Sequence, residues 1–384
     1  MNRSEIGSDR ALFLATALGG LGVVGAYFLA QPERFWANWI LWLLYVLTTG
    51  LGCLFIVALA HLVGARWSVP IRRVPERLSG LVVLAAPVAL VALVFALPAL
   101  YPWAQPEAAH HPIIAGKAPW LNVPFFAIRT IICFALWVTA YRIFTGGSVK
   151  QDQTRDPIFS VRARKFAPLF MLIFGLTITV VAFDWISSLE PEWYSDILGV
   201  YLFAGTFLSG LAATSLAVLY LMDRGRLPGV RPDHLYNLSG FLFAFTVFWS
   251  YIGFAQYMLM WYGNMPEEIF WYKHRIEGPW LNVILLLAFV HFVVPFFALI
   301  PRDRKADPRS LRWVAVLVLG AHFLDLYWLV VPAAGPTPPL SWPEISFALC
   351  FLGLALLWIR RAMTSGEDMP VGDPLLQEGL EFRL

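Results

Sequence analysis

The sequence predicts an all-α polytopic membrane protein with ten transmembrane helices. Of its 384 residues, 59% are hydrophobic and only 14% are charged, whereas about a quarter of the residues of a soluble chain are charged. The apolar residues form runs of roughly 20 residues, long enough for a helix to cross a bilayer core. Helices are expected because lipid cannot satisfy the hydrogen bonds of an exposed extended backbone.

The residues at the ends of the ten spans support the assignment of each span. The first span follows a polar segment and has no signal-peptide cleavage motif before Gln31. Each of the next eight spans borders one of four arginine-rich loops, and the last span begins beyond a proline-rich loop. The predicted spans are 11–30, 39–64, 81–101, 121–144, 166–187, 197–222, 239–262, 279–300, 311–331 and 343–361.

The loops between the spans alternate between basic and poorly basic. Loops 65–80, 145–165, 223–238 and 301–312 together hold seventeen Lys and Arg residues, against four in all the other loops. Basic loops stay on the cytoplasmic side of a membrane. The sequence therefore predicts a multi-pass protein whose N- and C-termini are both cytoplasmic, with loops 102–120 and 263–278 facing outward.

The pentapeptide Pro-Trp-Leu-Asn-Val occurs twice, at 119–123 and 279–283. Both copies open a span that crosses the membrane in the same direction. The two spans before the first copy start at 39 and 81, and the two spans before the second copy start at 197 and 239. These matching offsets indicate a parallel duplication. Coincidence is the alternative, because Pro and Trp both favour the entrances of spans.

A duplication divides the chain into five segments. Two four-helix bundles are expected, at 39–187 and 197–331. Segment 1–38 holds the N-terminal tail and one flanking helix, and 343–361 is the other flanking helix. Segment 362–384 is a polar tail that we expect to dock on a partner or to stay mobile.

Several ionisable side chains lie inside the predicted spans, where each needs a partner, water or a function. Asp184 and Asp325 lie in the last span of each bundle, and aromatic residues follow both. Arg129 lies about two turns inside the outer end of its span, and Asp184 lies within about one turn of the outer end of the next span, which is expected to be a neighbour in the same bundle. We expect an Arg129–Asp184 ion pair, which is either a structural contact or, together with Trp185, part of a quinol pocket.

Two histidines lie near the middle of their spans. His322 shares a helix face with Asp325, because the two are three residues apart. Since the ordinary pKa of imidazole suits proton exchange, His291, His322 and Asp325 are candidate groups of a proton path, together with Asp184 and Tyr251. Packed helix–helix contacts and axial ligation of a single haem stay open as alternatives.

Two acidic and aromatic segments lie in the loops expected outside the membrane. They form an amphipathic rim, a proton exit, or a surface on which a partner docks. The candidate docking residues are Glu190, Glu192, Glu267 and Glu268.

Other functions lack their motifs. The three cysteines, Cys53, Cys133 and Cys350, lie far apart inside apolar spans and form no CxxC, so no metal site is expected. No basic run has the aromatic interleaving of a nucleic-acid site. Nucleotide-binding loops and hydrolase nucleophiles are also missing, so catalysis by this chain alone is not expected.

Two stretches carry a resemblance to a known family. Residues 183–195 (FDWISSLEPEWYS) and 243–268 (FAFTVFWSYIGFAQYMLMWYGNMPEE) resemble signatures of the membrane subunits of alternative complex III. These subunits belong to the NrfD-like, polysulfide-reductase-type membrane family. The resemblance covers about residues 10–362, and the second stretch is more similar to the smaller of the two such subunits. One departure is Glu192, where the family's acidic loop is expected to carry His.

The resemblance implies a role in a bacterial inner-membrane complex that oxidises menaquinol or another quinol. Its iron–sulfur clusters and c-type haems are carried by an iron–sulfur subunit and c-type cytochrome subunits, so this chain binds no redox cofactor. A paralogous NrfD-like membrane subunit and lipids are the other partners implied. The clearer role implied for the smaller subunit is proton conduction.

Two further hypotheses remain beside that of a proton-conducting subunit. The chain either binds quinol directly in the first bundle, near Arg129, Asp184 and Trp185, or is a secondary transporter built from a repeat. The spans lack the paired Gly- or Pro-broken helices that transporters favour. The sequence leaves the type of quinone and the electron acceptor open.

Overall fold

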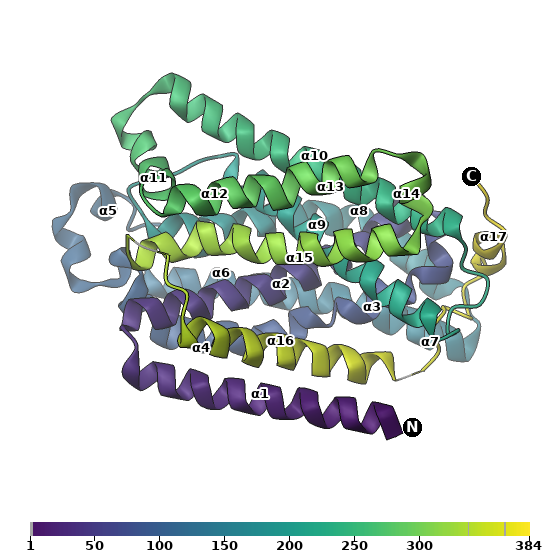
Figure 1. Ribbon diagram of the computed structural model, residues 1–384. Helices are drawn as coiled ribbons and strands as arrows, with labels where there is room; N and C mark the ends of the chain where they lie inside the picture. The colour runs from purple at the N-terminus through teal and green to yellow at the C-terminus, as the bar shows by residue number, and fades with distance from the viewer. Residues whose placement is uncertain (1–2, 337, 365) are drawn as a thin grey trace.

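A computed structural model of the protein describes residues 3–336, 338–364 and 366–384. The described chain is helical and contains no strand, and ten of its helical stretches are long and apolar enough to cross a membrane. The predicted fold class, an all-α polytopic membrane protein, is therefore confirmed. The longer helices run side by side along one direction (Figure 1).

Most spans are single helices, but three of them contain a π-helical turn, at 142–146, 182–186 and 289–293. Such turns shift the register of a helix by one residue and are frequent at functional sites. The α-helices are α1 (Arg3–Leu29), α2 (Pro32–Val63), α3 (Arg73–Leu78), α4 (Leu81–Leu100), α5 (Pro112–Gly116), α6 (Val123–Tyr141), α7 (Gly147–Thr154), α8 (Ile158–Val181), α9 (Leu198–Asp223), α10 (Pro232–Gly263), α11 (Pro266–Ile276), α12 (Trp280–Ala288), α13 (Val294–Leu299), α14 (Arg302–Ala306), α15 (Pro308–Val330), α16 (Trp342–Met363) and α17 (Leu376–Leu380).

The bundle has two ends that differ in character. At the tail end lie the start of α1, helices α3 and α14, and the C-terminal segment with α17 (Figure 1). At the loop end lie α5, α11 and the loops around them (Figure 1). The four arginine-rich loops all lie at the tail end, because each follows a span that runs away from the loop end.

The spans contact one another in two rings. In the first ring α2 contacts α4 and α8, and α6 contacts the same two helices. In the second ring α9 contacts α10 and α15, and the α12–α13 span lies between these two. Helices α1 and α16 pair with each other at the side of α2 (Figure 1).

Helices α2 and α9 join the two rings through small residues. A Cβ atom on Gly52 would lie 2.0 Å from the Thr206 carbonyl oxygen, and one on Gly210 would lie 2.4 Å from the Gly52 carbonyl carbon. Thr48 and Gly52 stand at the same places in α2 as Thr206 and Gly210 in α9, relative to the span starts predicted at 39 and 197. Small residues at such a spacing let two membrane helices approach closely.

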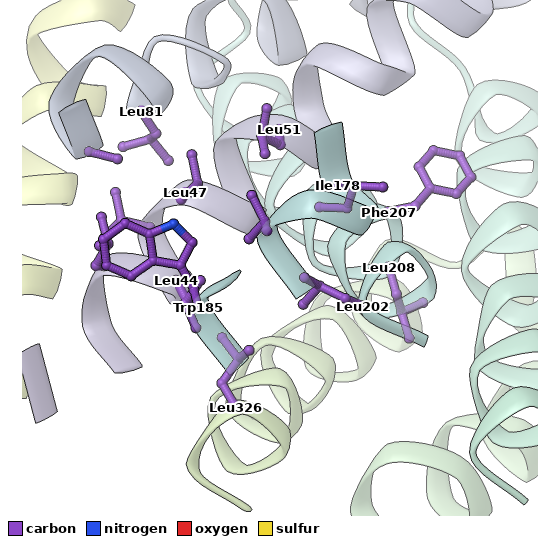
Figure 2. Packing of buried hydrophobic residues seen from close by; sticks show 14 of the residues in the cluster. Leu44, Leu47, Leu51, Leu81, Ile178, Trp185, Leu202, Phe207, Leu208 and Leu326 are labelled. Carbon is purple, nitrogen blue, oxygen red and sulfur yellow. The ribbon is translucent and has the colours of Figure 1, made fainter. Parts of the chain in front are cut away.

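Leucines and aromatic rings fill the space around this contact. Figure 2 shows Leu44, Leu47 and Leu51 of α2 near Leu202 and Leu208 of α9. The outer faces of α1, α8, α10 and α12 instead expose large apolar side chains. This distribution suits a protein surrounded by lipid, because the hydrocarbon of the bilayer is as apolar as the core.

The two copies of the repeated pentapeptide fold differently. Asn122 caps α6, since its side chain accepts a hydrogen bond of 3.0 Å from the Phe125 amide. In the second copy Gly278 turns the chain with φ +57°, and α12 already begins at Trp280. Asn282 therefore lies inside the helix and has no capping role.

The C-terminal segment folds onto the protein's own tail end instead of extending away from it as a mobile tail, and its expected docking on a partner stays a prediction. Asp368 forms ion pairs with Arg77 (2.7 Å) and Arg226 (2.6 Å), which come from loops of the first and second rings. Asp373 forms a 2.5 Å ion pair with Arg72. Burial alone would raise the pKa of Asp373, but the charge and hydrogen bond of Arg72 lower it below its ordinary value.

Candidate functional site

The ion pair predicted in the first ring is present. Arg129 Nε lies 2.7 Å from Asp184 Oδ2, and Arg129 Nη2 lies 2.9 Å from Asp184 Oδ1. The pair is buried, with Asp184 1% and Arg129 7% exposed. Two parallel N–H···O contacts between a guanidinium and a carboxylate are the strong, geometrically fixed form of an ion pair.

Trp120, from the first pentapeptide, completes this cluster. Its indole N–H donates to Asp184 Oδ1 at 3.0 Å, and its carbonyl oxygen accepts from Arg129 Nη1 at 2.9 Å. The guanidinium carbon lies 4.2 Å from the Trp120 ring centre and 4.3 Å from that of Phe125. The π-helical turn 182–186 contains Asp184, which links the irregular backbone to this polar contact.

A cavity of about 440 Å³ lies beside this cluster at the loop end. Trp120 lines it, whereas Arg129, Asp184 and Trp185 do not. Trp185 is instead buried against Phe126, with ring centres 5.0 Å apart. The lining residues include Lys117, Trp120, Phe183, Ser188, Trp193 and Tyr194.

Two of the lining residues, Trp193 and Lys117, carry N–H donors. Trp193 Nε1 is buried and has no acceptor within the described part of the chain. Lys117 Nζ donates to the Pro191 carbonyl at 2.5 Å and lies 5.4 Å from the Tyr194 ring centre. Burial lowers the pKa of Lys117, and the charge of Glu192 opposes this effect.

In the second ring Asp325 receives two hydrogen bonds from neutral donors. The Tyr201 hydroxyl donates to Oδ1 at 2.5 Å, and the Trp249 indole donates to Oδ2 at 3.1 Å. All three side chains are buried. Asp325 therefore differs from Asp184, whose charge is compensated by a guanidinium.

His322 connects this carboxylate region to the first ring. Its Nε2 lies 2.8 Å from the Thr48 hydroxyl on α2. A Cβ atom on Gly205 would lie 3.3 Å from His322 Nδ1 and 3.4 Å from Asp325 Oδ2, so both side chains pack against one glycine of α9. His322 and Asp325 thus share a face, as their spacing predicts.

His291 lies in the π-helical turn 289–293 and is fully buried. Its ring centre lies 4.1 Å from that of Trp249, the donor to Asp325. Among the described residues neither ring nitrogen of His291 has a hydrogen-bond partner. A buried imidazole of this kind calls for a functional or structural explanation.

Tyr251 does not join this network. It lies on the outer face of α10 with 64% of its surface exposed, whereas Trp249, two residues earlier, points inward. Sequence reasoning missed Tyr201, Trp249 and Thr48 as partners. The repeat carried one signal for Thr48, because its counterpart Thr206 stands at the same place in α9.

Each ring contains a buried carboxylate, but the partners of the two carboxylates differ. Val181 precedes Asp184 by three residues, where His322 precedes Asp325. Consistent with this difference, the Thr206 hydroxyl has no hydrogen-bond partner within the described chain, whereas Thr48 binds His322. The second ring thus contains an imidazole and a carboxylate that accepts hydrogen bonds from neutral donors, whereas the first ring contains a fixed ion pair.

The four predicted docking residues lie at the loop end. Glu190 is mostly buried and forms a 2.6 Å ion pair with Arg275, and Glu192 lies 3.1 Å from His111. Burial lowers the pKa of Arg275, and Glu190 opposes this effect. The other two acids, Glu267 and Glu268, occupy the first turn of α11 and are exposed and half-buried, respectively.

No model of a protein family matches this chain, and no curated protein matches it. Within the part of the chain that the structure describes, no three His, Cys, Asp or Glu side chains group as a metal site requires. The geometry alone therefore defines what this site can do. A buried carboxylate–phenol pair beside a buried imidazole–hydroxyl pair supplies groups that can take up and release protons.

Proposed function

We propose that the chain is an integral membrane subunit of a quinol-oxidising respiratory complex of the alternative complex III type. In that complex it corresponds to ActF, the smaller NrfD-like subunit. It conducts protons and acts as a scaffold, and it holds no redox cofactor of its own. Iron–sulfur and c-type cytochrome subunits transfer the electrons, beside the paralogous membrane subunit. The bacterial inner membrane is its location, with the arginine-rich tail end in the cytoplasm.

One observation carries this proposal: two buried hydrogen-bonded pairs, Tyr201–Asp325 and His322–Thr48, pack side by side against Gly205. These groups cost free energy in a membrane interior, and none of the described residues forms an ion pair with the carboxylate of Asp325. They cross from the second ring to the first at the α2–α9 contact. Such an arrangement supports transfer of a proton better than it supports a structural ion pair.

The test compares two tyrosines on vesicles that contain the whole complex. Tyr201→Phe removes the hydroxyl bound to Asp325, whereas Tyr251→Phe removes one on the outer face. We expect Tyr201→Phe and Asp325→Asn to lower the number of protons moved per electron, and Tyr251→Phe to leave it unchanged. Assembled complexes of the first two variants that move protons like the unaltered complex would refute the proposal.

A second candidate function, direct quinol binding, is favoured by the 440 Å³ cavity at the loop end of the first ring. Its aromatic wall and the Lys117 ammonium group suit a ring that carries oxygen acceptors. A photoreactive quinone analogue should then label 183–196, and Trp120→Leu should weaken this labelling. Labelling of the paralogous subunit alone would exclude this candidate.

A further inference from the structure

The short helix α14 presents two cations without an acidic partner. Among the described residues, neither Arg302 nor Lys305 has a carboxylate within the 4.0 Å of an ion pair, whereas Arg312 lies 2.7 Å from Asp223. Arg302 is exposed and Lys305 is half-buried. The charge of these two side chains is therefore left for a molecule outside the chain to compensate.

Both cations lie over aromatic rings of α10. Lys305 Nζ is 4.5 Å from the Phe243 ring centre, and the Tyr236 ring centre is 6.0 Å from Lys305 Nζ and 5.9 Å from the Arg302 guanidinium carbon. The two cations are three residues apart and so share one face of α14. The rings hold them at the side of the bundle, beside α10.

The two acids nearest in sequence form no ion pair with these cations. Asp307 caps α15 by accepting from the amide of Ser310 at 2.9 Å, and its hydrogen bonds with Ser310 lower its pKa. Asp303 is exposed on α14 itself, but it has no ion-pair contact with Arg302 or Lys305 in the described structure. The surface beside α10 therefore keeps a positive charge.

An apolar surface continues from the cations toward the middle of the membrane. The rings of Phe243 and Phe296 stack with centres 5.4 Å apart, and Phe297 and Ile300 are exposed by 64% and 46%. Helix α10 contacts both α13 and α14, so the cations and the aromatic surface belong to one site. A ligand that fits both parts has an anionic head and hydrocarbon chains.

We propose that Arg302 and Lys305, with Tyr236 and Phe243, bind the phosphate headgroup of an anionic phospholipid at the tail end of the second ring. The phosphate lies between the two cations, and its acyl chains lie along Phe296 and Phe297. This site is independent of the proton path, because it uses none of the same side chains. It gives the tail end a preference for a lipid class rather than for lipid in general.

The test uses the full chain in nanodiscs of phosphatidylethanolamine, with phosphatidylglycerol or cardiolipin titrated in and native mass spectrometry as the readout. We expect one tightly retained anionic lipid, and roughly 30-fold weaker binding in Arg302→Gln/Lys305→Gln. The control, Lys150→Gln/Lys165→Gln, removes two exposed cations from the other side of the tail end and should leave binding unchanged.

Three outcomes overturn the proposal: no retained lipid, equal loss in both double variants, or displacement of the lipid by millimolar inorganic phosphate. The last would indicate a site for free phosphate, and the second a diffuse attraction. Unfolding temperatures in phosphatidylethanolamine alone establish that the variants fold. Should the double variant not fold, Lys305→Gln alone is expected to lose roughly fivefold, and Lys305→Arg to retain binding.

Discussion

Replacing Asp184 by Asn should destabilise the protein, because it leaves a buried cation without its counter-charge. The substitution leaves the Arg129 guanidinium buried, with its two contacts to a carboxylate reduced to contacts with a neutral amide. Breaking a buried ion pair by removing one partner costs about 3–5 kcal/mol. We expect about 3 kcal/mol, because the Trp120 carbonyl and two aromatic rings still stabilise the cation.

The assay is a double-mutant cycle on the free energy of unfolding in mixed micelles. Arg129→Met/Asp184→Asn removes both charges, so its cost should be smaller than the sum of the single costs by about 2–3 kcal/mol. Glu267→Gln, which neutralises an exposed acid, is the control and should change stability by less than about 0.5 kcal/mol. A cost below about 1 kcal/mol for Asp184→Asn, or additive single costs, would show that the pair is not a buried, coupled contact.

Three other predictions concern backbone contacts and the tail. Gly52→Ala should destabilise by about 1–3 kcal/mol or more, because its Cβ meets backbone of α9, whereas Gly175→Ala, with open space around it, should not destabilise. Asn122→Ala should cost about 1 kcal/mol through the lost cap, and Asn282→Ala almost nothing, both measured as unfolding free energies. The pKa of Asp373 is lowered in the folded state, so its contribution to tail docking is complete above about pH 4 and is lost as the pH falls through its folded pKa. A spin label on the tail should therefore become mobile only in acid, and Asp373→Asn should abolish this step; release at neutral pH in the unaltered protein would contradict it.

The spans could be predicted because each is encoded locally, by a run of apolar residues long enough to cross a bilayer. The Arg129–Asp184 pair could be predicted as well, since two opposite charges near the outer ends of successive spans have few other partners. The direction in which a side chain points was harder to predict from the sequence. Trp249 and Tyr251 are two residues apart and so point about 200° apart around a helix, and only the packing of α10 shows that Trp249 is the inward one.

The partners of Asp325 and the docking of the tail could not be predicted for a different reason. Tyr201 and Asp325 lie in separate spans of the second ring, and no local pattern specifies which helices become neighbours. Asp368 and Asp373 follow the last span in a segment whose composition is typical of mobile tails. Their fixed positions depend on Arg72, Arg77 and Arg226, which the sequence shows only as topological markers of the basic loops.

The ion pairs of Asp368 and Asp373 with arginines of the tail end have a consequence for how the protein is made. Its residues are translated after all ten spans, yet they clamp arginines from both halves of the molecule. The two halves can therefore enter the bilayer and associate through α2 and α9 before these two carboxylates hold them together at the tail end. The contacts of Asp368 and Asp373 are then the last to form between the two halves.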